Sequence, residues 1–225
     1  MDSTRVAGTL MVLLPIAFNA FFFLLQRTFE YPDILRRPTD YVLDRFQKGG
    51  QRLVAIWYGF MLTAVLFAPL AVLVHQVLKG DEIPYMRVGT TIGVLAGVVQ
   101  FLGLARWPFL VPYLASAYHD RASGQATRAA VDVTFQTFNR FAGVAIGEHL
   151  GYLFTSIWTA FVGLAMTRSP LFSPWLGWIG FIPAVGIFVG VLEGFGFRAA
   201  GTITAIAYIL WSVWLIVTGV TLMLR

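Results

Sequence analysis

The chain has 225 residues, of which 58% are apolar and 12% are Asp, Glu, Lys or Arg, about half of the ~25% charged share of a soluble domain. The formal net charge is +5 and there is no cysteine. The composition excludes a disordered chain, a nucleic-acid-binding domain and an ordinary soluble enzyme, and it indicates an integral membrane protein. The missing thiols exclude disulfides, thiolate metal sites and cysteine nucleophiles.

Six apolar stretches are long enough to cross the ~30 Å hydrocarbon core of a bilayer, which takes about 17–25 helical residues. They are continuous and lack the alternation of a membrane barrel, so we expect an all-α fold, a polytopic membrane helix bundle in a single integral membrane domain over residues 1–225. The first stretch does not resemble a signal peptide, because no cluster of positive charges precedes it. The transmembrane helices are expected at about 6–26, 53–78, 88–105, 142–167, 172–192 and 201–224.

The connection between the first two spans contains the pattern of a short helix. Thr39-Asp40 after Pro38 is a favourable helix start, and Gly49-Gly50 is a favourable stop. Between them apolar side chains fall on one face and charged side chains on the other. We predict a short interfacial helix at about 39–48 that lies on the cytoplasmic membrane surface.

The third span is expected to continue as a helix kinked at Pro108, and the fourth helix to begin near Thr127. Arg106 and Arg140 are almost equally distant from the turn near residues 122–123, so an antiparallel pair of helices places them at similar depth. Two arginines at the cytoplasmic interface can bury their stems and extend their charged ends toward phosphate or carboxylate groups.

The basic residues are distributed unequally between the two sides of this topology. Eleven of the sixteen Lys and Arg residues fall in the 27–52 connection, in the 106–140 segment and at Arg198, and five fall on the other side. The positive-inside rule therefore predicts that the larger set faces the cytoplasm and that both termini lie outside.

Three motifs resemble an uncharacterised family of bacterial multi-pass membrane proteins, classed as a domain of unknown function. They are Phe-Glu-Tyr-Pro-Asp-Ile-Leu-Arg-Arg-Pro at 29–38, Arg-Trp-Pro at 106–108 and Gly-Glu-His-Leu-Gly-Tyr at 147–152. The resemblance covers nearly the whole chain. It implies a location in the bacterial inner (cytoplasmic) membrane and carries over no activity, cofactor or catalytic residue.

Glycines recur every four residues in three of the predicted helices. Such rows let helix backbones approach closely where lipid removes the hydrophobic drive for association. We expect packing within the chain rather than between copies, because each row has neighbours in its own bundle. Pro183 predicts a kink in the fifth helix. The rows are Gly93 and Gly97; Gly143, Gly147 and Gly151; and Gly186, Gly190 and Gly194.

Polar side chains of the predicted helices gather in their cytoplasmic half, and ionisable groups inside a membrane are functional candidates by default. Glu148 and His149 are the candidate acid–base pair, and Tyr152 follows Glu148 on the same helical face. Gly97 and Gln100 are expected opposite Glu148 on the neighbouring helix. The candidate ligand-binding residues are Glu30, Trp57, Tyr58, Gln100, Arg106, Asn139, Arg140, Tyr152 and Glu193.

These residues favour a polar cavity, entered from the cytoplasmic side, that binds a small amphiphile: a lipid, a quinone or an isoprenoid. The alternatives are an intramembrane enzyme with Glu148 and His149 as acid and base, and a non-catalytic scaffold subunit of a membrane complex. A structural alternative is an ion pair of Glu148 with Arg140 or Arg106 that holds helices together. The pattern leaves open whether the protein is an enzyme.

The sequence names no cofactor, and we predict no metal site. His75 and His119 are expected at other depths than His149, so a metal would need His149, Glu148 and Glu30 together. The expected partners are membrane lipid and a small amphiphilic ligand, without nucleic acid; a homo-oligomer or membrane-complex partners stay open. A transporter is disfavoured, because the two halves of the chain show no repeat.

Overall fold

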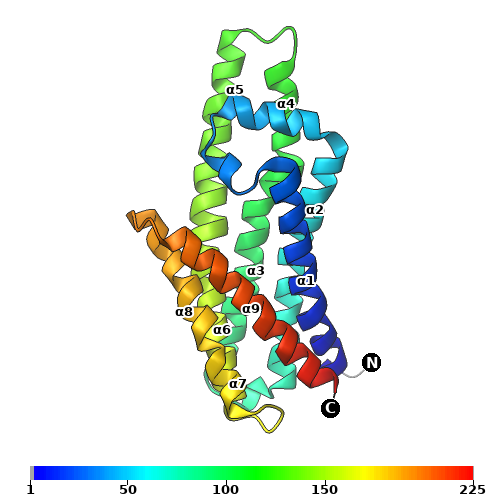
Figure 1. Cartoon of the computed structure of the whole chain (residues 1–225), viewed down its shortest axis with the longest axis vertical. Coiled ribbons are helices and arrows are strands. Elements are labelled where there is room, and N and C mark those ends of the chain that lie inside the picture. Colours follow the sequence, from blue (N-terminus) through cyan, green and yellow to red (C-terminus); the bar gives the residue numbers. More distant parts are fainter. Residues whose placement is uncertain (1–2, 225) are drawn as a thin grey trace.

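A computed structural model describes residues 3–224, and every regular element in that range is a helix (Figure 1). The elements are α1 (Ser3–Phe29), η1 (Asp33–Arg36), α2 (Thr39–Val77), η2 (Gly80–Glu82), α3 (Met86–Phe109), α4 (Val111–His119), α5 (Gln125–Phe138), η3 (Asn139–Leu150), α6 (Gly151–Met166), α7 (Pro174–Ile179), α8 (Phe181–Val189), η4 (Gly190–Phe195) and α9 (Ala200–Met223).

Six helical runs are long and apolar enough to cross a membrane, which confirms the all-α fold and the six-helix bundle. Besides Thr39–Val77, which has 39 residues, two of them are much longer than a span requires: Met86–His119 has 34 residues and Gln125–Met166 has 42. Their ends, α4 and α5, form a hairpin that extends beyond the other helices, and both termini lie at the opposite end of the bundle (Figure 1).

The helix α2 has two parts, because Gly50 has non-helical torsion angles (φ 53°, ψ −153°). A positive φ is a conformation that glycine adopts without a steric penalty. The part before Gly50 matches the interfacial helix predicted at 39–48, and it lies across the bundle in Figure 1. Its apolar face is fully buried, however, against side chains of α3, α4 and α5 such as Trp107, Leu114 and Phe135. Protein, rather than lipid alone, therefore covers this face.

The glycine row of η3 and α6 faces α3. A Cβ atom built on Gly143 would lie 2.5 Å from Nη2 of Arg106, and one on Gly151 would lie 3.0 Å from Cγ of Gln100. Between these positions Gly103 and Gly147 meet backbone to backbone, with a Cβ on Gly103 only 2.6 Å from Cα of Gly147. Glycine therefore sets the distance between these two helices.

Other glycines of the rows also meet neighbours within the chain, but the expectation of such packing is wrong for Gly194, whose added Cβ would have no atom within 4 Å. Gly186 lies against Ala207 and Gly190 against Thr204 and Tyr152, so α8 and η4 pack on α9 and α6. The expectation that Gly97 lies opposite Glu148 is wrong: a Cβ at this position would meet Ala64 and Ala68 of α2. Helix α3 is thus packed on two sides. Counting residues from the turn near 122–123 predicts depth along the helix, but it could not assign each glycine to one of these sides.

The fifth span is interrupted, as Pro183 predicts, but the break between α7 and α8 falls at Gly180. Proline lacks an N–H and its ring crowds the carbonyl four residues earlier, so the distortion appears one turn before the proline. Beyond the break, α8 and α9 incline relative to the other helices, and their η4 end diverges from the bundle (Figure 1).

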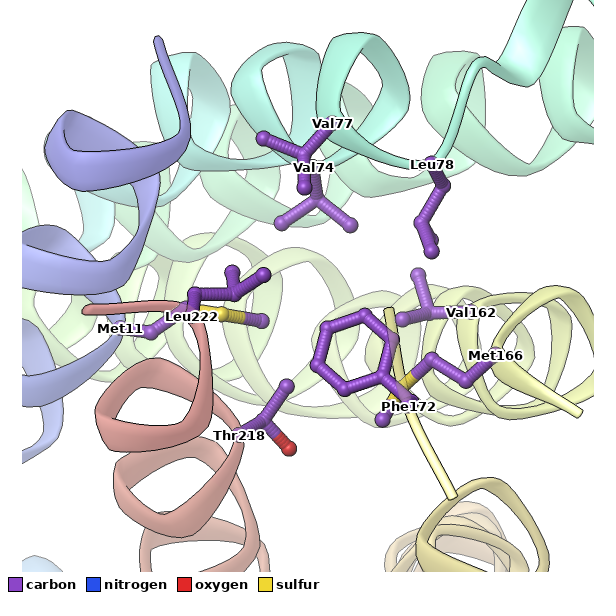
Figure 2. Close-up of a pocket in the computed structure, with 9 residues that line it drawn as sticks. All are labelled: Met11, Val74, Val77, Leu78, Val162, Met166, Phe172, Thr218 and Leu222. Atoms are coloured by element: carbon purple, nitrogen blue, oxygen red, sulfur yellow. The ribbon is translucent and has the colours of Figure 1, made fainter. Parts of the chain in front are cut away.

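Near the termini the bundle holds a void of about 10 Å³ (Figure 2). Its lining is almost entirely aliphatic and aromatic, and the single hydroxyl drawn, that of Thr218, donates to the backbone oxygen of Trp214. A void of this size is at the lower limit for one water molecule, and an apolar void of this kind stays dry. This end of the bundle is a packed core.

Candidate functional site

Five polar side chains from five separate segments come together in the half of the bundle that carries η1. Their charges and hydroxyl groups interact with one another across the segments, and each side chain is half-buried. We call this group the polar cluster. Its members are Tyr31 between α1 and η1, Arg106 of α3, Glu148 of η3, Tyr152 of α6 and Tyr208 of α9.

Glu148 is the acidic member of the polar cluster. The charged groups that act on it are Arg106, Glu193 and Arg36, in that order of influence. Among residues 3–224, no basic nitrogen lies within 4.0 Å of its carboxylate, so the direct ion pair with Arg106 or Arg140 is not present. The carboxylate is therefore free to accept hydrogen bonds from a ligand.

Arg106 is the basic member and is positioned by its backbone neighbours. Its Nη1 donates to the backbone oxygen of Gly103, and its Nη2 donates to Oδ1 of Asn139 at 3.1 Å. The guanidinium group lies over Gly143, where a Cβ atom would displace it. A guanidinium has five N–H donors, and these contacts use two of them. The rest of the group can bind an acceptor.

Tyr31 reaches the polar cluster because the chain reverses after α1. Glu30 has a positive φ of 56°, and the Tyr31 ring turns back to contact Phe22 and Trp57, with ring centroids 5.5 and 5.2 Å away. Burial raises the pKa of the Tyr31 phenol, and the negative charge of Glu148 raises it further. Tyr31 therefore keeps its proton and can donate a hydrogen bond.

The rings of Tyr152 and Tyr208 contact each other within the polar cluster. Their ring centroids are 6.0 Å apart, and the Tyr208 ring stacks on Phe18 of α1 at 6.1 Å. Nε2 of Gln100 donates to Oγ1 of Thr155 at 2.9 Å, so the predicted Gln100 ties α3 to α6. A hydrogen bond between α3 and α6 and a ring contact between α1 and α9 therefore accompany these two tyrosines.

The backbone that carries Glu148 is unusual. Asn139–Leu150 is a π-helix of 12 residues that joins the α-helices α5 and α6. π-helical turns are rare and occur frequently at functional sites, where they change the direction of side chains. The segment also carries Asn139, Arg140 and His149, which were all candidates from the sequence.

The predicted site residues do not all meet. Glu30 pairs with Arg45 at 2.8 Å and accepts a hydrogen bond from the Tyr41 hydroxyl, so it fixes α2 rather than lining the polar cluster. Tyr58 is 45% exposed beside Phe109, and Arg140 is exposed. Tyr58 and Arg140 therefore lie on exposed faces of their helices and not in the polar cluster.

Two further predicted residues have structural surroundings of their own. Trp57 is fully buried and stacks on Trp107 at 4.5 Å behind Arg106; both indole N–H groups lack a hydrogen-bond partner within residues 3–224. The His149 ring lies 6.3 Å from that of Phe195, and no hydrogen bond within the described chain joins it to Glu148. The two members of the predicted acid–base pair are therefore adjacent in sequence without a hydrogen bond between their side chains in the described chain.

An ion pair beside the polar cluster joins η1 to η4. Nη2 of Arg36 lies 3.9 Å from Oε1 of Glu193, with side chains 76% and 43% exposed. Both charges also act on Glu148, so they lie close to the cluster. Among the ion pairs of residues 3–224, this loose, exposed pair alone joins η1 to η4.

Sequence reasoning missed Tyr31, Tyr208 and Arg36. A signal for Tyr208 existed, because Thr204, Tyr208 and Ser212 recur every four residues in an otherwise apolar helix. Such spacing places hydroxyl groups on one face. Tyr31 and Arg36 carried no signal beyond their motif, since the chain reversal that positions them depends on tertiary contacts.

Other chemistry finds less support in the described chain. Within residues 3–224 no group of three or more His, Asp or Glu side chains could hold a metal ion, and Glu30 is too well paired to join His149 and Glu148. An open hollow of about 310 Å³ lies between the start of α2 and the α4–α5 hairpin, lined by Asp40, Arg128 and Asp132 among others. It contains no member of the polar cluster.

Comparison with known proteins places the chain in a family. The family model described as Domain of unknown function (DUF4386) matches residues 6–219, as the resemblance of the three motifs led us to expect. No curated protein and no solved structure matches the chain. The match covers nearly the whole bundle, including every member of the polar cluster. The chain therefore belongs to the DUF4386 family, whose function is unknown.

Proposed function

We propose that this protein binds a small amphiphile, a lipid, quinone or isoprenoid, in a polar intramembrane cavity on the cytoplasmic side. The observation that carries the proposal is the polar cluster itself. It brings a carboxylate and a guanidinium together without an ion pair between them, and each side chain is accessible in part. Charged groups inside a membrane are costly unless they have partners, so an unpaired arrangement is one that a ligand completes.

The surroundings of the polar cluster suit an amphiphile rather than a fully polar solute. Phe18 and Phe22 of α1 border it on one side, and Tyr208 borders it on the side of α9. Further along α9, Ile206 and Ile209 are 54% and 58% exposed. A polar head group in the cluster could therefore extend its apolar part between α1 and α9 toward lipid.

The proposed location follows from charge and family. The family resemblance supports a bacterial inner membrane, and the excess of Arg and Lys around η1, α2 and the α4–α5 hairpin supports a cytoplasmic side for these segments. In this orientation both termini lie outside, and η1 and η4 lie near the inner leaflet.

The proposal is tested by mass spectrometry of whatever copurifies with the protein in mild detergent. The wild type should retain a defined amphiphile above the level of bulk lipid, and Glu148→Gln should lose it. The amide preserves the shape of the side chain and removes its charge, so the Tm should stay within a few degrees. Glu82→Gln changes an exposed carboxylate at the end of η2; it is the matched control and should retain the amphiphile.

Two results would overturn the proposal. A wild type that retains nothing above bulk lipid has no such cavity. A Glu148→Gln variant that loses stability by roughly 3–5 kcal/mol, the cost of breaking a buried ion pair, would make Glu148 a structural strut. An intramembrane enzyme would instead reveal itself by a chemically altered amphiphile, and a scaffold subunit by copurifying protein chains.

A further inference from the structure

We infer that the head group bound in the polar cluster is a zwitterionic phosphoethanolamine, with its ammonium on Glu148 and its phosphate on Arg106. This inference rests on the proposed function and names the class of its ligand. It is drawn from the charges, the free hydrogen-bonding groups and the aromatic border of the polar cluster.

The two sides of the polar cluster carry opposite charges. Glu148 and Glu193 lie on one side, where Arg36 pairs with Glu193 at 3.9 Å, so one net negative charge remains there to attract a cation. Arg106 lies on the other side, where Asn139 and the Gly103 carbonyl hold its guanidinium without a carboxylate within 4.0 Å in the described chain. A ligand with one positive and one negative group satisfies both sides, whereas a purely anionic head group leaves Glu148 repelled, and a quinone leaves both charges unpaired.

The free hydrogen-bonding groups fit the same head group. An ammonium has three N–H donors, and an ionised Glu148 carboxylate offers only acceptors for them. Phosphate oxygens are acceptors for the unused N–H groups of Arg106 and for the phenol of Tyr31. A trimethylammonium group carries the same charge but no N–H, so phosphatidylcholine should bind less well than phosphatidylethanolamine.

The membrane lipid, rather than a soluble head group, fits the aromatic border. Phe18 and Tyr208 stack at 6.1 Å directly beside the polar cluster, at the junction of α1 and α9. The glycerol esters of a phospholipid would lie at this level, and its acyl chains would follow the apolar surface of α9 into the bilayer.

Native mass spectrometry of the full chain measures the preference directly. The protein in detergent is mixed with equal amounts of palmitoyl-oleoyl phosphatidylethanolamine, phosphatidylglycerol and phosphatidylcholine, and the retained lipids are counted. We expect phosphatidylethanolamine to be retained about tenfold better than either competitor, a difference of ~1.4 kcal/mol, because only its ammonium donates charge-assisted hydrogen bonds to Glu148.

Variants connect this preference to the two charges. Glu148→Gln should remove the preference for phosphatidylethanolamine over phosphatidylglycerol, while Glu148→Asp, which keeps the charge, should retain most of it. Arg106→Lys keeps a positive charge at this position. It should weaken the retention of all three phospholipids, because a single ammonium replaces the planar guanidinium fork. Glu82→Gln should match the wild type.

The outcomes separate this inference from the proposed function. Equal retention of the three lipids, or preference for phosphatidylglycerol, would overturn the head-group assignment while an amphiphile site stands. Competition by soluble glycerophosphoethanolamine as strong as that of the lipid would support the head-group chemistry and assign a free metabolite as its source. Competition by the lipid alone would support it and assign a membrane source. An unchanged preference in Glu148→Gln would overturn the inference.

Discussion

Gly103→Ala tests the helix crossing that supports the polar cluster. The new Cβ atom would lie 2.6 Å from Cα of Gly147 and 3.0 Å from the backbone oxygen of Ala142, whereas ordinary contacts begin near 3.4 Å. Both obstacles are backbone atoms, so no rotamer change can relieve the overlap. The helices α3 and η3 must separate by most of 1 Å. Overpacking of this kind costs about 1–3 kcal/mol.

The thermal consequence is measurable. For a chain of this length, 1 kcal/mol shifts the Tm by roughly 2–4 °C, so Gly103→Ala should lower it by roughly 2–12 °C. Circular dichroism or tryptophan fluorescence of the detergent-purified protein measures this shift. Gly124→Ala is the matched control, because no atom lies within 4 Å of its added Cβ and its φ of −73° suits alanine. Equal Tm values for the two variants would refute the close approach of α3 and η3.

Three further predictions use other parts of the chain. Cysteines introduced at Ser3 and Ser123 should react with an impermeant thiol reagent from opposite faces of the membrane, and labelling of both from outside would contradict the proposed orientation. Glu30→Gln should lower the Tm by a few degrees at most, because its 2.8 Å pair with Arg45 is more than one-third exposed and such pairs contribute about 0–1 kcal/mol; a larger loss would mean that the pair is a main support of α2. Burial raises the pKa of Tyr31, so the wild type should lose stability as pH rises above 10.0, its ordinary value, while Tyr31→Phe loses less; parallel Tm curves up to alkaline pH would contradict the burial of this phenol.

The fold could be predicted to the extent that it depends on patterns along one helix. The lengths of the apolar stretches and the positions of charges gave six spans, and the glycine spacing gave a close contact of η3 with α3 through Gly143, Gly147 and Gly151. These signals are local, since hydrophobic length and i, i+4 spacing are properties of single segments. The side to which Gly97 turns is not local, and the prediction for it was wrong.

The polar cluster could be predicted only in part for the same reason. Glu148, Arg106 and Tyr152 were candidates because charged and hydroxyl groups are rare inside a membrane. Tyr31 joins them through a chain reversal at Glu30, and neither the reversal nor the π-helix of η3 follows from residue spacing. Glu30 was a candidate because of its predicted depth in the membrane, but it forms an ion pair with Arg45 of α2.

The two walls of the polar cluster differ in how firmly the fold holds them. Arg106 and Glu148 stand beside the Gly103–Gly147 crossing and in front of buried aromatic rings, whereas residues 192–199 between η4 and α9 are exposed. A segment with few buried contacts opens at low free energy, so a ligand should enter between η1 and η4.

Arg36→Gln tests this path. The change removes the 3.9 Å contact with Glu193 that joins η1 to η4, and an exposed pair contributes up to about 1 kcal/mol. If separation of η1 from η4 limits exchange, bound lipid should exchange up to about fivefold faster with a Tm within about 2 °C of the wild type. Exchange of a fluorescent phosphatidylethanolamine measures the rate. An unchanged rate would mean that the ligand enters elsewhere, because the exposed pair would then be remote from the step that limits access.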